Sequence, residues 1–175
     1  MTASATTPVS TTAPTTAPTT ASIPAAPADS RALGLAHYAA RGVLEHFLAR
    51  HGATFPQQVT LRAAVTAGAP QTADALVSQV RASLKSDPAD VRASLDELLA
   101  SGLLVADGDQ LRPTEAGRDL LAAVAAETAP VSARIWSGIP AEDLAATGRV
   151  LALVTERANA ELAGLTAHTA GPTAD

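Results

Sequence analysis

The sequence predicts a mainly helical fold that carries one short β-hairpin, and three observations support this prediction. Apolar residues recur at helical spacing in stretches spread from Ser30 to Leu165. The dipeptide Asp107-Gly108, typical of a tight hairpin, separates two short apolar runs. Hydrophobic residues make up 47% of the chain but aromatic residues only 2%, so we expect helices that pack closely through small side chains.

The stretch from Asp87 to Gly117 predicts a helix, a hairpin and the start of another helix, in that order. Asp87 is a helix cap, Pro88 suits the first helical position, and Gly102 stands where a helix end favours a left-handed residue. The apolar face of this helix consists of Val91, Leu95, Leu98 and Leu99. The hairpin strands are predicted at 103–105 and 110–112, and Thr114 caps the next helix. This order is typical of a winged helix-turn-helix unit, which makes double-stranded DNA the first partner to test.

The remaining helices are predicted from apolar periodicity and from residues that begin or end helices. Their predicted starts are Ser30, Pro56, Thr72, Thr114 and Pro140. The first is expected to end at Gly52 and the second near Gly68. In the helix that follows Thr114, Pro130 is expected to produce a kink or a break.

These elements predict a winged-helix core at 54–113 flanked by dimerisation helices at 30–52 and 114–165. The flanking helices are too long and apolar to be covered by a core of about 60 residues. A dimer interface and an intramolecular bundle bury the same residues, so periodicity alone does not choose between them. Residues 1–29, rich in Thr, Ala and Pro, and residues 166–175 are predicted to be disordered tails outside the 30–165 domain.

Five motifs in order resemble those of the MarR family of dimeric winged-helix transcriptional regulators. They span about Arg31 to Leu165 and are FPQQ at 55–58, DPADV at 87–91, LLASGLL at 98–104, PTEAG at 113–117 and GIPAEDL at 138–144. Phe55 stands where the family usually has Thr. The resemblance implies a homodimer whose terminal helices intertwine, a DNA-binding winged helix, and a small aromatic ligand bound between the two parts. It also implies a mechanism in which the ligand changes the spacing of two recognition helices and so releases DNA.

The candidate DNA-binding residues follow from the 88–100 helix and its neighbours. They are Arg81, Lys85, Ala89, Arg92, Ala93 and Arg112. Arg92 is the long cation on the exposed helix face, suited to guanine edges or phosphate, and the two alanines suit thymine methyl groups. Lys85 and Arg81 are candidates for phosphate contacts, whereas Arg112, at the base of a short wing, is expected to pair with Asp107 or Asp109 and to contact the DNA backbone.

Charge opposes this prediction. The chain has a net charge of −5, and the segment from Thr54 to Pro113 contains five basic and seven acidic residues. Family members usually carry Arg or Lys near the positions of Ala93 and Glu97, and this chain does not. The alternative is therefore a winged-helix interaction or dimerisation module with little DNA affinity, in which the exposed face of the 88–100 helix is merely solvated.

The candidate ligand-binding residues are the aromatic side chains Tyr38, Phe47, Phe55 and Trp136. The resemblance implies a pocket for an aromatic ligand, and these residues are suited to line it. Core packing is the alternative role for a lone Trp in an aromatic-poor chain.

Other functional classes have little support in the residues. There is no Cys, no Gly-x-Ser-x-Gly motif and no phosphate-binding Gly-rich loop, so we expect neither an enzyme nor a cofactor. The histidines at 37, 46 and 51 lack the i, i+4 spacing of a preformed metal site. No apolar run reaches 18 residues and no signal peptide is evident, so we expect a cytoplasmic protein without a membrane partner.

Overall fold

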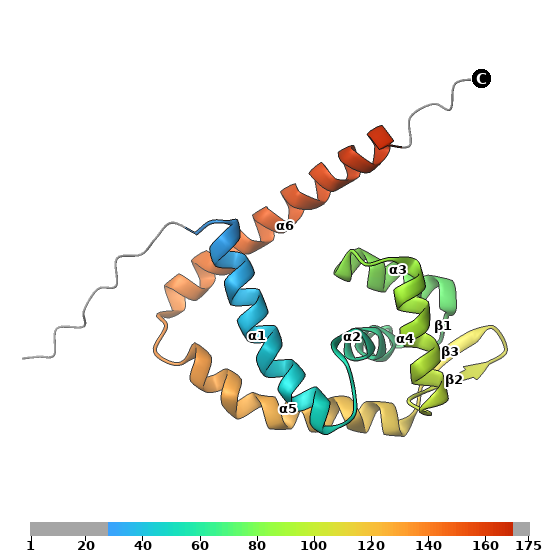
Figure 1. The fold of residues 1–175 in the computed structure, drawn as a ribbon. Coiled ribbons are helices and arrows are strands. Elements are labelled where there is room, and N and C mark those ends of the chain that lie inside the picture. Colours follow the sequence, from blue (N-terminus) through green and yellow to red (C-terminus); the bar gives the residue numbers. More distant parts are fainter. Residues whose placement is uncertain (1–27, 170–175) are drawn as a thin grey trace, which may run out of the picture. The chain divides into compact units, whose positions relative to one another are not determined.

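The computed structural model describes residues 28–169, and contacts divide the chain into two bodies, Met1–Tyr38 and Ala39–Asp175. Most of the predicted 1–29 tail and residues 170–175 lie outside the described residues. The elements, drawn in Figure 1, are α1 (Ser30–Arg50), α2 (Phe55–Thr66), β1 (Gln71–Thr72), α3 (Ala73–Leu84), α4 (Pro88–Ala100), β2 (Leu104–Asp107), β3 (Gln110–Pro113), α5 (Glu115–Trp136) and α6 (Ala141–Thr169). This order confirms the predicted fold class.

Polar caps fix where the helices begin. The Asp87 side chain accepts a hydrogen bond from the Ala89 backbone N–H at 2.8 Å, and α4 therefore starts at Pro88 as predicted. Thr114 caps α5 by accepting from the Gly117 N–H at 3.0 Å. A capping box between Thr54 and Gln57 starts α2 at Phe55, one residue before the predicted start.

The hairpin belongs to a three-stranded antiparallel sheet in the order β1-β3-β2. Leu104 pairs with Pro113 and Asp107 with Gln110, and Gly108 takes the positive φ of 61° that the tight turn between them requires. Sequence reasoning missed β1. Its two residues carry no periodicity, and the strand exists only because Gln71 pairs with Leu111 across the chain.

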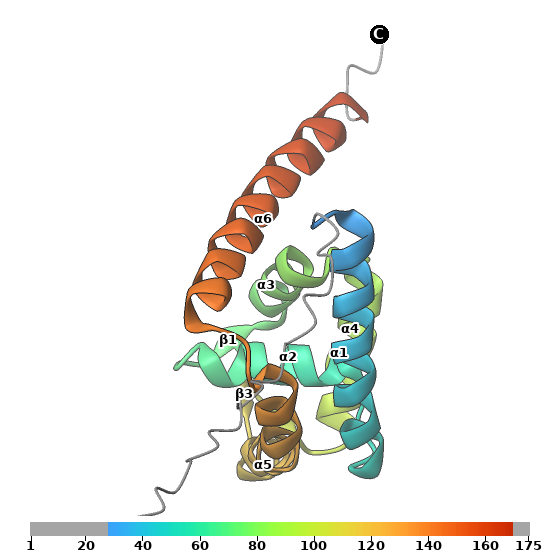
Figure 2. The same ribbon diagram turned by 90° about the vertical axis from the view of Figure 1, so that its left-hand side faces the viewer.

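The main core lies between α2, α3, α4 and the sheet, elements that Figures 1 and 2 show packed against one another. Its fully buried side chains include Leu61, Leu76, Val80, Leu98 and Leu104. A smaller cluster of Leu48, Ala53 and Val124 ties the end of α1 to α5. The 88–100 helix is thus held on its apolar side, as its sequence pattern predicts.

The long terminal helices differ from the core in burial. α5 continues through Pro130 to Trp136, so the proline does not end the helix. α6 extends to Thr169, past the predicted limit at residue 165, and its large apolar side chains Val150, Leu151 and Val154 are between 41% and 51% exposed. Within residues 28–169, no helix combines the length and hydrophobicity needed to cross a membrane.

Candidate nucleic-acid interface and the adjoining pocket

Helix α4 divides its side chains among three environments. Val91, Ser94, Leu95 and Leu98 are buried in the core. Asp90, Ala93 and Glu97 line a pocket beside the helix. Ala89 and Arg92 are exposed and do not line that pocket. Of the two alanines predicted to touch DNA, Ala89 is on the outward side and Ala93 borders the pocket.

Arg92 is held by an acidic residue of the preceding helix. Its Nη2 donates to Asp74 Oδ1 at 2.9 Å, and the two side chains are 56% and 85% exposed. Exposed pairs of this kind contribute little to stability, so a DNA phosphate or a guanine can displace Asp74 at small cost. Sequence reasoning counted Asp74 only as one more acid, because its contact with a residue eighteen positions away carries no local signal.

The other predicted DNA contacts are exposed cations on two elements. Arg81 lies in the last turn of α3, and Lys85 caps that helix in a left-handed conformation with φ 55°. The Lys85 Nζ donates to the Ala82 carbonyl at 2.6 Å, and this hydrogen bond holds the ammonium group against the C-terminal end of α3. Arg112 on β3 is exposed, and within the described part of the chain it pairs with neither Asp107 nor Asp109. The wing itself is a two-residue loop between Asp107 and Gln110, as short as predicted.

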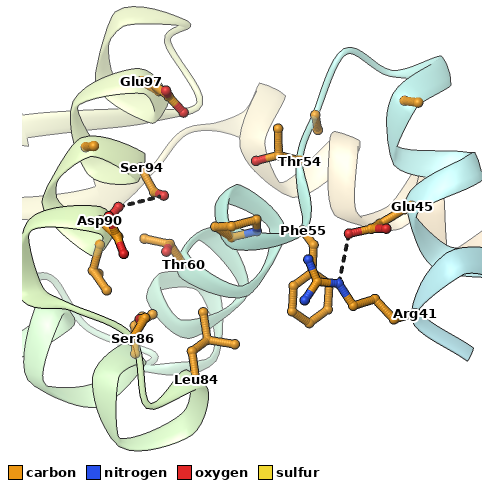
Figure 3. Close-up of a pocket in the computed structure, with 16 residues that line it drawn as sticks. Arg41, Glu45, Thr54, Phe55, Thr60, Leu84, Ser86, Asp90, Ser94 and Glu97 are labelled. Carbon is orange, nitrogen blue, oxygen red and sulfur yellow. Dashed lines mark hydrogen bonds and ion pairs between the residues drawn. The ribbon is translucent and has the colours of Figure 1, made fainter. Parts of the chain in front are cut away.

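A pocket of about 720 Å³ lies between α1, α2 and α4 (Figure 3). Arg41 of α1 donates from Nε to Glu45 Oε1 at 2.8 Å, and its guanidinium carbon lies 4.4 Å from the centroid of the Phe55 ring. Ala49, Ala53, Val80 and Leu84 add apolar wall. The volume is within the range of small-molecule sites, about 300–1,000 Å³.

Polar groups in the pocket wall are incompletely paired. Thr60 is 0% exposed, and its Oγ1 has no hydrogen-bond partner in the described structure. The Ser86 Oγ is likewise buried and unpaired there. Glu97 accepts from Gln57 Nε2 at 2.8 Å, whereas the Asp90 carboxylate takes part in none of the ion pairs or side-chain hydrogen bonds found among residues 28–169. Buried polar atoms are normally satisfied, so these two hydroxyls are exceptions among the described residues.

The four aromatic residues predicted to bind a ligand do not share one pocket. Phe55 lines the pocket beside α4, Phe47 a more open hollow with Ala39 and His46, and Trp136 an apolar hollow of about 240 Å³ with Val43 and Leu44. Tyr38 belongs to the other body of the chain and is 69% exposed. Sequence reasoning missed Thr60, Glu45 and Asp90 as pocket residues, although the seven-residue spacing of Asp90 and Glu97 places both on one helix face.

His51 is one of the histidines considered above as possible metal ligands, and it takes part in a polar group at the end of α1. His51 Nε2 lies 3.1 Å from Glu127 Oε1, and Arg50 Nη1 lies 3.0 Å from the other carboxylate oxygen, so this group joins the end of α1 to α5. Among the described residues, no three His, Cys, Asp or Glu side chains gather as metal ligands would.

No protein-family model and no curated protein matches the sequence. Solved structures do match. The p-coumaroyl-CoA complex of CouR from Rhodococcus jostii RHA1 is 22% identical, with a TM-score of 0.59 over 70% of this chain and 88% of the other. A MarR-family transcriptional regulator from Rhodococcus sp. RHA1 is 22% identical, with a TM-score of 0.58 over 74% and 98%. BpsR of Bordetella bronchiseptica, whose DNA binding is regulated by 6-hydroxynicotinic acid, is 18% identical, with a TM-score of 0.58 over 73% and 94%.

These likenesses confirm the fold that the sequence motifs predicted. The chain has the winged helix-turn-helix fold found in solved MarR-family transcriptional regulators.

Proposed function

We propose that this protein is a homodimeric DNA-binding transcriptional regulator of the MarR type, a repressor that a small molecule releases from its operator. The observation that carries the proposal is the double role of α4. This helix bears Arg92 on an exposed face and lines a 720 Å³ pocket with Asp90, Ala93 and Glu97. A molecule in the pocket therefore touches the same helix that is offered to DNA.

Helix α4 is the proposed reader of the DNA major groove. In winged helix-turn-helix proteins the second helix of the motif enters the groove and its first turns contact base edges. Ala89 and Arg92 lie in the first turns of α4 and are exposed. Arg81, Lys85 and Arg112 supply further cations for the phosphate backbone, and Ala93 is the remaining predicted contact.

The proposed dimer is formed by the terminal helices. Leu151, Val154 and Leu162 lie on one face of α6 and are each 41% to 43% exposed. Exposed apolar stripes of this length on a soluble protein indicate an interaction surface. A second copy of the chain covers them in our proposal, and a two-fold axis then presents two α4 helices to half-sites one helical turn of DNA apart.

The effector is proposed to act by shifting the position of α4. A ligand that binds one arrangement of the helices better than the other shifts the population toward it. CouR is solved with p-coumaroyl-CoA and BpsR responds to 6-hydroxynicotinic acid, and by analogy we propose a small aromatic effector here. Phe55 is the aromatic residue that lines the pocket. In our proposal Tyr38, Phe47 and Trp136 contact the ligand only if dimer formation changes the positions of their side chains.

The proposed activity is binding without catalysis, and because its partner is chromosomal DNA we place the protein in the cytoplasm. A fluorescence-anisotropy titration of the full-length protein against its own upstream intergenic DNA tests the proposal. Saturable binding that exceeds binding to shuffled DNA by about a thousandfold at physiological salt is expected. Equal affinity for both DNAs, or no binding even at low salt, would replace the regulator with a winged-helix interaction module.

A further inference from the structure

We propose that the pocket between α1, α2 and α4 selects a cationic ligand with a flat apolar body. This inference rests on the proposed function, because it names the effector class of the same pocket. The fold alone does not determine the charge of the pocket, because that charge depends on the side chains that this sequence places in the wall.

The charge of the wall is the first observation. Three carboxylates line the pocket, Glu45, Asp90 and Glu97, against one guanidinium, that of Arg41. Arg41 is already engaged by Glu45 and by the face of Phe55. An anionic ligand would thus meet two carboxylates that no cation of the wall neutralises, and a cation would be attracted by both.

The placement of the two acids is the second observation. Asp90 and Glu97 are seven residues apart on α4, so they lie on one face of the helix and about 10 Å apart along its axis. Figure 3 shows them on one side of the pocket with Glu45 on the opposite side. The Asp90 carboxylate is the one without a side-chain partner among the described residues, which makes it the first candidate to receive a positive group.

The buried hydroxyl of Thr60 is the third observation. The side chain is fully buried, lines the pocket, and leaves Oγ1 without a hydrogen bond in the described structure. A buried hydroxyl without a partner lowers stability, and a ligand N–H donor would satisfy its oxygen lone pairs. An ammonium or amidinium group supplies several such donors, whereas a carboxylate supplies none.

The apolar part of the wall defines the rest of the ligand. Ala49, Ala53, Val80 and Leu84 present small aliphatic groups, and the Phe55 ring adds a flat surface. Ligand sites combine such a wall with a few placed polar groups that orient the ligand. A fused aromatic ring that carries one amine meets both requirements.

Titration calorimetry of the full-length protein with two matched naphthalenes tests the proposal. The probes are 2-(aminomethyl)naphthalene, a cation at neutral pH, and 2-naphthoate, an anion with the same ring. We expect the cation to bind at least tenfold more tightly, which corresponds to about 1.4 kcal/mol. Equal affinities, tighter binding of the naphthoate, or binding of neither compound would overturn the proposal.

Matched variants locate the effect. Asp90→Asn combined with Glu97→Gln should remove the preference for the cation, because both amides keep the size of the side chain. Asp96→Asn removes one charge from the same helix outside the pocket wall and should leave the preference intact. If Asp96→Asn weakens cation binding as much as the double variant does, general electrostatic attraction explains the result and the pocket proposal is wrong.

A Thr60→Val variant separates ligand contact from structure. We expect weaker cation binding together with an unchanged or higher melting temperature of the unliganded protein, because the variant removes an unpaired buried hydroxyl. Unchanged cation binding contradicts the assigned role of Thr60. Failure of upstream DNA binding with cation binding intact would instead count against the regulator function and leave the ligand class standing.

Discussion

Arg92 is the proposed principal DNA contact, and it lies in a segment where acidic residues outnumber basic ones. Its ion pair with Asp74 is exposed and holds the guanidinium at the surface of α4. In such a setting an acidic neighbour can orient an arginine, and it also competes with DNA phosphate. The two roles of Asp74 have opposite consequences and can be separated by mutation.

Replacing Arg92 with Ala should weaken operator binding by about 1–3 kcal/mol per half-site and relax the preference at one base pair. Arg157→Ala, which removes the same charge from α6, is the control and should leave affinity within measurement error. Anisotropy titrations against the operator and single-base variants measure both effects. Wild-type affinity for Arg92→Ala would mean that α4 is not the reader.

Asp74→Asn tests the ion pair from its other side. If Asp74 mainly competes with phosphate, the variant should bind all DNA sequences more tightly and with a steeper dependence on salt. If Asp74 mainly orients Arg92, the variant should lose discrimination between operator and shuffled DNA. Unchanged affinity, salt dependence and discrimination would show that the ion pair has no role in DNA binding.

Gly117 makes a steric demand that the sequence motif contains but does not explain. A Cβ at this position would collide with the Leu103 carbonyl oxygen, and it would also press on the Leu61 side chain. The sequence identifies Thr114 as the cap of α5 from residue type alone. The need for glycine three residues later depends on the close approach of the Leu103 backbone, just before β2, which only the folded structure reveals.

Gly117→Ala should therefore destabilise the protein by more than about 2 kcal/mol, since backbone has to move to admit the methyl group. Gly148→Ala in α6 is the matched control, because no atom lies within 4 Å of the added methyl group. That change should stabilise the helix by about 0.5–1 kcal/mol. Urea denaturation measures both, and equal effects of the same sign would contradict the assigned contact.

At the scale of elements, the sequence predicts what local chemistry decides. The caps at Asp87 and Thr114, the apolar faces of α3 and α4, and the hairpin at Gly108 are all encoded within a few residues. Strand β1 and the separation of Phe47, Phe55 and Trp136 into different hollows depend on partners distant in sequence. The passage of α5 through Pro130 also differs from the predicted kink or break. The distribution of the α4 side chains among the core, the pocket and the exposed face likewise depends on elements distant in sequence.

The Asp87 cap tests whether α4 depends on its local start signal. Asp87→Ala should lower the free energy of unfolding by about 0.5–2 kcal/mol, because the Ala89 N–H loses its side-chain acceptor. Asp87→Asn keeps an acceptor at the same place and should cost much less. Both are measured by urea denaturation, and an equal loss in the two variants would mean that charge and not the cap stabilises the helix.

At the scale of the whole molecule, the exposed apolar face of α6 is the feature that a single chain leaves unexplained. Leu144, Leu151, Val154 and Leu162 recur at intervals of seven, three and eight, which keeps them on one side of a 29-residue helix. Exposing such a face to water is unfavourable, and Ile135 and Trp136 at the end of α5 are also more than half exposed. In our proposal a second copy of the chain covers this face and also supplies the second α4 that a two-part operator requires.

Multi-angle light scattering of the full-length protein at micromolar concentration should therefore give about twice the chain mass of 17.5 kDa. Leu151→Asp or Val154→Asp should give monomers, because either places an unpaired charge in an apolar contact. Ala160→Asp adds the same charge two and a half helical turns beyond Leu151, on the opposite side of α6, and should remain dimeric.

In the same samples the monomeric variants should lose operator affinity while keeping their helical circular dichroism. A wild-type monomer would remove both the dimer and the spacing mechanism, whereas a monomeric Leu151→Asp variant with full operator affinity would show that one α4 suffices for DNA binding.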